Sequence, residues 1–404
     1  MATVVTTRDQ PEPAPRFTAV DALRGAVMVI MALDHTRDFF HAGAMSFSPE
    51  DLARTTPILF FTRWITHVCA PVFLFTAGIG AFLRLDRPGA TKAQLSRFLL
   101  TRGAWLILIE LTVMRLAFNF SFEMRYPVLL LVLCALGVAM IALAALIYLP
   151  RRVLAVASLA VIILHNSLDS VQASQFGAFG GVWNVLHQQG VFVLGGIAVV
   201  AGYPVMPWIA VMALGFCVGP IFRLEPHLRQ WLLLKWGTLL IIAFVLLRAV
   251  NVYGDPAPWS LQPSATYTLL SFLRTTKYPP SLDFLLMTIG PALLALAWFD
   301  RRRLAASNPL VVIGRVPFFY YVTHFWALHL LVALMAWLRY GAAVPLFSPV
   351  PSMGGSRDLF PQDFGYPLWV VYIVWIAVVV ALYPLCRWFA AVKARRRDWW
   401  LSYL

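Results

Sequence analysis

The sequence predicts an all-α polytopic integral membrane protein, a helical bundle with about ten transmembrane helices. Of its 404 residues, 60% are hydrophobic and only 12% are charged, about half the charged fraction of a soluble domain. The apolar runs are long enough to cross a bilayer as helix, which takes about 20 residues. These runs are continuously apolar rather than alternating, so an outer-membrane barrel is excluded.

The basic residues fix the expected topology. If the N-terminus is cytoplasmic, most of the 32 Lys and Arg residues fall on the cytoplasmic side of the crossings. The positive-inside rule then places both termini in the cytoplasm, for a multi-pass protein of the cytoplasmic (inner) membrane. Topology thus explains the net charge of +14, and we expect no nucleic-acid partner. The predicted crossings are 18–41, 57–83, 98–119, 126–149, 153–168, 203–222, 231–251, 279–299, 309–338 and 366–390.

One apolar stretch, 189–222, is too long for one crossing and short for two. The charge pattern requires a net single crossing here, although two crossings within 190–222 stay open. We therefore expect 190–201 to be a short interfacial or re-entrant segment, which is tolerated only where its backbone is buried in protein.

The chain reads as one membrane domain, 18–392, between two cytoplasmic tails. Residues 1–17 are polar and Pro-rich, without the apolar region of a signal peptide, and predict a disordered tail. Residues 393–404 form a basic tail. The longest outer loops, about 252–278 and 339–365, are rich in Pro, Gly, Ser and aromatic residues and have the composition of caps over a cavity.

Known metal and nucleotide motifs are missing from the sequence. The four cysteines lie within predicted spans, and no pair shows metal-ligand spacing. A P-loop, a dinucleotide fingerprint and an H-E-x-x-H zinc motif are absent. We therefore predict no metal.

The first predicted helix is the most informative, because ionisable groups inside a bilayer are costly and usually mark a relay, an ion path or an active site. Arg24 and His35 are eleven residues apart, which places them within about 20° on one helix face and roughly 16 Å apart along the axis. Asp38 follows His35 within one turn, where a carboxylate can orient an imidazole and raise its basicity. We predict His35 as a catalytic base and Asp38 as its orienting partner.

Further titratable residues lie from mid-depth outward and are candidate substrate-binding groups. Each also has a structural interpretation, because a hydrogen bond between membrane helices contributes about 0.6 kcal/mol and an intramembrane Arg can pair with a carboxylate of the first helix. His165 and Asp169, four residues apart, fit that structural interpretation. The candidates are His41, Arg63, His67 and His324.

Four separated motifs resemble the heparan-alpha-glucosaminide N-acetyltransferase-like family, including its short bacterial members. They are VDALRG at 20–25, HVCAPVFLFTAG at 67–78, YPVMPWIAVMALG at 203–215 and IGRVPFFYYVTH at 313–324. The Arg–His pair of the first helix also resembles the signature of the related acyltransferase 3 family. The resemblance implies acyl transfer, usually of acetyl, from cytoplasmic acyl-CoA to an acceptor on the far side of the membrane.

The resemblance further implies a catalytic role for a first-helix histidine and donor binding by Arg24. The local sequence departs from the animal lysosomal enzyme, so the match to its catalytic histidine stays open between His35 and His41. Acyl-CoA is polyanionic, and the basic inner loops would attract it.

Our leading hypothesis is an acyltransferase embedded in the lipid bilayer. It moves an acyl group, usually acetyl, from cytoplasmic acyl-CoA such as acetyl-CoA to a hydroxyl or amine of a carbohydrate-like acceptor on the far side of the membrane. The alternatives are a proton-coupled transporter that uses the same buried His, Asp and Arg groups, and a non-catalytic scaffold. The sequence leaves open the acceptor, the acyl chain length, direct transfer against an acyl-histidine intermediate, and whether the chain forms a homodimer.

Overall fold

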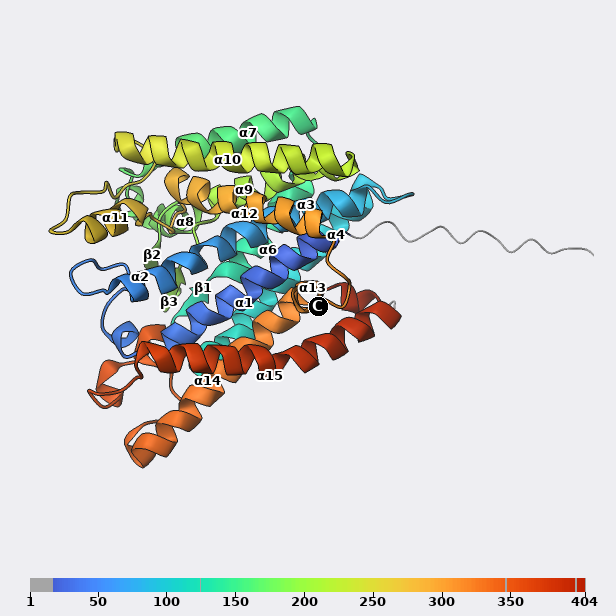
Figure 1. Cartoon of the computed structure of the whole chain (residues 1–404). Coiled ribbons are helices and arrows are strands. Elements are labelled where there is room, and N and C mark those ends of the chain that lie inside the picture. Colours follow the sequence, from blue (N-terminus) through green and yellow to red (C-terminus); the bar gives the residue numbers. More distant parts are fainter. Residues whose placement is uncertain (1–16, 124, 346, 397, 404) are drawn as a thin grey trace, which may run out of the picture.

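Long helices run side by side through the protein, and the loops gather at the two ends of the bundle (Figure 1). The computed structural model describes residues 17–123, 125–345, 347–396 and 398–403. We call the end where α1 begins the basic end; it carries the turns 86–91, 147–150, 219–225 and 303–308. The opposite end, the loop end, carries 41–56, 120–131, 165–204, 251–281 and 341–367.

The helices account for most of the chain. Their bounds are α1 (Thr18–Phe40), α2 (Pro57–Trp64), α3 (Cys69–Leu85), α4 (Lys92–Ile109), α5 (Arg115–Asn119), α6 (Val132–Leu146), α7 (Arg151–Leu164), α8 (Gly180–Leu186), α9 (Val205–Val218), α10 (Pro226–Val250), α11 (Ala265–Leu273), α12 (Leu282–Arg302), α13 (Pro309–Arg315), α14 (Pro317–Tyr340) and α15 (Leu368–Arg395). The α2–α3 pair is joined by a 3-10 turn and the α4–α5 pair by a π turn.

The predicted helical membrane fold is confirmed. Seven helical segments of the described chain are long and apolar enough to cross a membrane, and each coincides with a predicted crossing. The other three predicted crossings coincide with α1, with α4–α5 and with α6. These three are not among the seven because α1 and α4–α5 carry more charge than an ordinary span, and because α6, with 15 residues, is shorter.

The segment 190–201 does not cross the bundle. It forms a β-hairpin at the loop end, in which β2 (Gly190–Leu194) pairs antiparallel with β3 (Ile197–Ala201). The short β1 (Val128–Leu130) adds a parallel strand to β3. We expected burial in protein to make this backbone tolerable, but the backbone N–H and C=O groups are instead paired by hydrogen bonds between the strands. Only α9 crosses within 190–222, as the charge pattern requires.

Several helices cross where glycines bring two backbones together. A Cβ on Gly25 would lie 1.8 Å from the carbonyl oxygen of Leu310, and one on Gly78 would lie 2.0 Å from that of Met212. Membrane helices favour small residues at such crossings, because van der Waals packing replaces the hydrophobic effect in lipid. The glycine pairs are Gly25 and Gly314 for α1–α13, Gly78 and Gly215 for α3–α9, Gly103 and Gly137 for α4–α6, and Gly237 and Gly290 for α10–α12.

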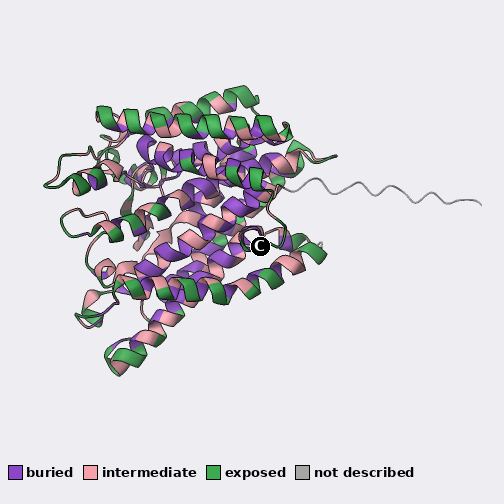
Figure 2. Cartoon of the chain, in the orientation of Figure 1, coloured by how far each residue is buried: buried purple, intermediate pink, exposed green. Residues whose placement is uncertain are grey.

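Burial separates a central from a peripheral set of helices. Figure 2 shows α1 mostly buried, whereas α7, α10 and α15 expose one whole side. That side is apolar, with Leu246 on α10 and Val380 on α15 among its exposed residues. Extended apolar surfaces of this kind are rare on soluble monomers, and on a protein with apolar helices long enough to span a bilayer they indicate contact with lipid.

The two predicted tails differ in what the structure describes. Residues 1–16 of the predicted disordered tail lie outside the described residues, whereas the ring of Phe17 packs 4.9 Å from that of Phe222. At the other end, α15 continues to Arg395 and a 3-10 turn spans Trp399–Ser402. The hydroxyl of Tyr403 lies 2.7 Å from that of Thr101 on α4, so this C-terminal segment is docked on the bundle.

Candidate active site

His35 lies on α1 in contact with a second histidine of α14. His35 Nδ1 is 2.8 Å from His324 Nε2, and His324 Nδ1 is 2.8 Å from the carbonyl oxygen of Tyr320. A carbonyl only accepts, so neutral His324 carries its proton on Nδ1 and accepts at Nε2. His35 Nδ1–H is then the donor, which leaves a lone pair on His35 Nε2. This tautomer is the one that a general base needs.

The contacts correct the expectation for Asp38. Its carboxylate pairs with the neighbouring Arg37, while His35 Nδ1 is paired with His324. Residues three apart on a helix point about 60° apart, whereas His324 faces His35 directly from another helix. Asp38 nevertheless lines the same cavity as His35.

A cavity of about 430 Å³ opens beside His35 at the loop end, and we call it the loop-end cavity. It is rich in charge of both signs. Asp34 forms ion pairs with Arg37, at 2.9 Å, and with Arg63. The charged and aromatic polar groups in its wall are Asp34, His35, Arg37, Asp38, Glu50, Arg63, Tyr203, Lys277, Tyr278 and Tyr321.

His67 reaches this cavity only through Glu50. His67 Nε2 lies 3.0 Å from Glu50 Oε1, and His67 itself is 1% exposed. Burial favours the protonated acid, but the nearby His67 ring and the Arg63 guanidinium outweigh burial and lower the pKa of Glu50 to about 2. Glu50 is therefore an anionic wall group that His67 positions.

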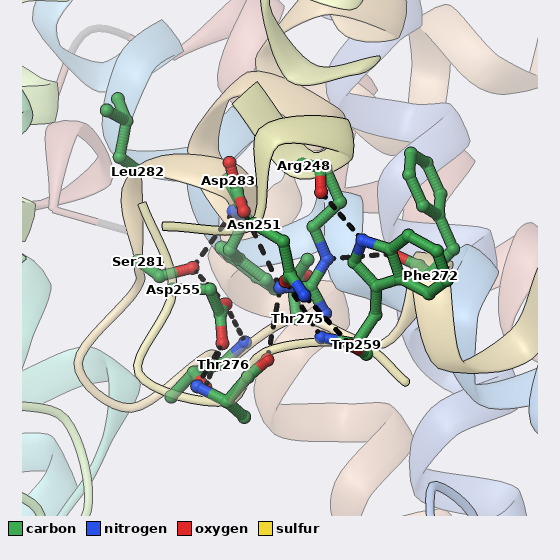
Figure 3. Close-up of polar contacts among 12 residues, drawn as sticks. Arg248, Asn251, Asp255, Trp259, Phe272, Thr275, Thr276, Ser281, Leu282 and Asp283 are labelled. Carbon is green, nitrogen blue, oxygen red and sulfur yellow. Dashed lines mark hydrogen bonds and ion pairs between the residues drawn. The ribbon is translucent and has the colours of Figure 1, made fainter. Parts of the chain in front are cut away.

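The loop that brings Lys277 and Tyr278 to the cavity is held by a polar network (Figure 3). The Arg248 guanidinium donates to the carbonyl oxygens of Phe272 at 3.0 Å and Arg274 at 2.6 Å. The Asp255 carboxylate accepts from the amide of Thr276 at 2.7 Å and from the hydroxyl of Ser281 at 2.6 Å. These contacts fix both sides of the segment 276–281.

A second cavity, of about 260 Å³, lies toward the basic end, and we call it the basic-end cavity. Its wall is mostly aliphatic and aromatic, and its charged groups are Arg24 and Arg102. Arg24 Nε donates to Thr76 Oγ1 at 3.0 Å, which directs the guanidinium along α3. Gly80 faces this guanidinium, since a Cβ there would lie 3.1 Å from its terminal nitrogen.

The two cavities are neighbours, because Val132 and Tyr321 line both of them. The Tyr321 ring is 6.2 Å from the His35 ring. His35 therefore lines the loop-end cavity close to the wall that the two cavities share.

Comparison with known proteins identifies the family. The sequence model described as heparan-alpha-glucosaminide N-acetyltransferase, catalytic, matches residues 16–249, which is more than half of the chain. The chain belongs to this family. A search of curated proteins finds no match. As a member of the N-acetyltransferase family, the chain is a transferase, and its apolar helices make it a multi-pass membrane protein.

In this member of the family, the fold brings together only some of the predicted site residues. Arg24 lines the basic-end cavity, and His35, Asp38 and Arg63 line the loop-end cavity. His324 and His67 line neither cavity, but they contact His35 and Glu50, respectively, which line the loop-end cavity. His41 lies at the end of α1, where its backbone bridges to Tyr366, and it lines neither cavity.

Sequence reasoning missed Glu50, Lys277 and Tyr278. They come from loops that close over the end of α1. The signal for Lys277 and Tyr278 was the composition of 252–278, which indicates a cap over a cavity but does not identify the residues that point inward. Glu50 lies in the loop 41–56 and had no such signal.

Proposed function

We propose that this protein transfers an acetyl group from acetyl-CoA, bound at the basic end, to a hydroxyl or amine of a carbohydrate-like acceptor in the loop-end cavity. The observation that carries the proposal is that two cavities of opposite character are neighbours beside His35. Family membership supports acetyl as the group transferred.

The basic-end cavity suits the donor. Its apolar wall would hold the pantetheine arm, while Arg24 and Arg102 offer forked donors that match phosphate geometry. Arg84 lies on the same end of the bundle, its guanidinium 3.8 Å from the centre of the Phe98 ring. A cluster of guanidinium groups raises the local concentration of a polyanion such as CoA.

The loop-end cavity suits a polar acceptor. Its carboxylates and cations can bind hydroxyl and amino groups, and Tyr203 and Tyr278 offer aromatic and hydroxyl surface. In the proposed step the acceptor oxygen or nitrogen attacks the thioester carbonyl, and its proton passes to His35 Nε2. The C–S bond then breaks, and the CoA thiolate takes the proton back from His35. We propose direct transfer because the two cavities share a wall close to the base.

For the topology we propose that the basic end faces the cytoplasm, as the positive-inside rule indicates. In a variant that lacks Cys217, a single cysteine at exposed Ser356 tests the loop end and one at exposed Ser307 the basic end. On intact cells an impermeant maleimide should label Ser356→Cys only, and Ser307→Cys should label after permeabilisation. Labelling of both without permeabilisation would reject this orientation.

The test of function uses purified protein in liposomes with acetyl-labelled acetyl-CoA and a panel of amino sugars and neutral sugars. The expected result is labelled acceptor with wild-type protein and transfer at least about 100-fold slower with His35→Ala. Equal transfer by wild type and His35→Ala would remove His35 from the mechanism. Uptake of unmodified sugar without acetylation would instead support a transporter.

A further inference from the structure

A cluster of metal-ligating side chains lies at the loop end, away from both cavities. His165 directly follows α7, Asp169 comes four residues later, and His187 directly follows α8. One ligand atom from each residue lies within 4.8 Å of the other two. Both histidines are 2% exposed, so the cluster is a built feature of the interior and not a surface coincidence.

The spacing of the two imidazoles fits a shared ion better than a hydrogen bond. His165 Nδ1 and His187 Nε2 are 3.4 Å apart, beyond the 2.7–3.2 Å of ordinary protein hydrogen bonds from nitrogen. In a tetrahedral site with Zn–N distances of about 2.0–2.1 Å, two nitrogen ligands stand about 3.4 Å apart. The imidazoles already have that separation.

Asp169 is oriented by a neighbour in the way that metal-binding carboxylates are. Asn166 Nδ2 donates to Asp169 Oδ2 at 2.8 Å, and Asn166 Oδ1 accepts from the amide of Leu282 at 2.9 Å. Hydrogen bonds of this kind fix the ligand and tune metal affinity.

We propose that His165, Asp169 and His187 bind a divalent transition-metal ion, with Zn²⁺ as the best match. Two imidazoles and one carboxylate are ligands that zinc prefers, with water in the fourth position, whereas Ca²⁺ and Mg²⁺ select sites built from oxygen. The site revises the prediction of no metal made from the sequence, because the third ligand is 18 residues beyond Asp169 and follows no known spacing.

Metal binding requires one rearrangement. His187 Nε2 also lies 3.0 Å from the carbonyl oxygen of His165, a contact in which Nε2 carries the proton. An ion takes the lone pair of Nε2, so the proton must move to Nδ1. The ligand atoms are already gathered, so binding requires only this proton shift.

The ion would tie three parts of the loop end together. His165 and Asp169 belong to the end of α7, His187 to α8, and Asn166 connects them to Leu282 at the start of α12. Leu282 follows Ser281, which the Asp255 network holds (Figure 3). The proposed ion therefore supports the loop that presents Lys277 to the loop-end cavity.

Metal binding by the full-length protein in detergent tests the proposal. The protein is stripped with a chelator, titrated with ZnCl₂ by calorimetry and analysed for metal by mass spectrometry. Wild type and the control variant His227→Ala, which alters an exposed histidine at the basic end, should each bind one Zn²⁺ per chain at this site. His187→Ala should lose this binding, and Asn166→Ala should bind about 10- to 100-fold more weakly.

A rescue variant separates loss of a ligand from loss of folding. His187→Cys supplies a thiolate, which is a good zinc ligand, and should recover binding. With Co²⁺ in place of Zn²⁺ it should add a sulfur-to-metal charge-transfer band that wild type lacks. Zinc binding by His187→Ala equal to that of wild type, or no binding by wild type, would overturn the proposal. Neither result would alter the proposed acetyl transfer, because the readout is metal content.

Discussion

The basic-end and loop-end cavities lie along the same helix, yet their walls differ in kind. The basic-end cavity is lined by aliphatic and aromatic side chains, with Arg24 and Arg102 as its charged groups. The loop-end cavity has carboxylates, guanidinium groups and an amine in its wall. The first resembles a site for a long apolar arm with an anionic head, and the second a site for a small polar molecule. A single helix can thus serve two substrates of opposite chemistry.

Removal of the proposed base, His35, tests most sharply whether the two cavities have different roles. His35→Ala should lower kcat by about 10²–10⁴-fold, since this is the typical contribution of a general base. CoA affinity should stay at the wild-type value, because His35 lines only the loop-end cavity. Turnover and CoA calorimetry on the same preparation measure both quantities. A parallel loss of CoA binding would contradict the proposal that the donor binds in one cavity and the base acts in the other.

The converse change is made at the other end of α1. Arg24→Ala should weaken CoA binding about 10- to 100-fold, as expected for one hydrogen bond to a charged group, while the acceptor KM stays unchanged. Arg24→Lys should recover part of the affinity, because a point charge remains. Exposed Arg97, on α4 at the same end, provides the matched control as Arg97→Ala. Unchanged CoA affinity in Arg24→Ala would make Arg24 a partner of α3 alone.

A smaller effect is expected from the cap of the loop-end cavity. Lys277→Met keeps the length of the side chain and removes its charge, so the acceptor KM should rise about tenfold while CoA affinity is unaffected. The control is Lys235→Met, an exposed position on α10. A change in CoA affinity without a change in acceptor KM would show that Lys277 contacts the donor and not the acceptor.

The smallest effect concerns stability in acid. The folded pKa of Glu50, about 2, is below the ordinary value of 4.5, so its carboxylate stabilises the fold above pH 4.5. This contribution is lost as pH falls from 4.5 toward 2. Glu50→Gln lacks it, and its thermal midpoint should fall about 2–4 °C less than that of wild type over this range. Scanning fluorimetry from pH 5 to pH 2.5 measures the difference; parallel curves would exclude the ion pair with His67.

Local pattern in the sequence predicts the helices and the two ends of α1. The crossings follow from apolar runs and charge asymmetry, which are properties of neighbouring residues. The eleven-residue spacing of Arg24 and His35 predicts that both side chains lie on one face of α1, at two different depths in the membrane. Each of the two residues lines one of the two cavities. These predictions need no knowledge of which helices are neighbours.

Contacts between distant residues could not be predicted in this way. His324 pairs with His35 across 289 positions, and Lys277 reaches the cavity only because the Arg248 and Asp255 contacts fold its loop inward. Asp38 lies within one helical turn of His35, but its carboxylate pairs with Arg37. The cluster of His165 and His187 likewise depends on how α7 and α8 end side by side.

The glycine crossings constrain how the bundle can move. With backbone pressed on backbone between α1 and α13, and again between α3 and α9, neighbouring helices cannot slide or rock without a clash or a gap. Alternating access in a transporter needs such rocking. In this protein we expect the helices to remain a fixed frame. Tyr321 lies in the wall that the two cavities share, so we expect rotation of this single side chain to be able to connect them.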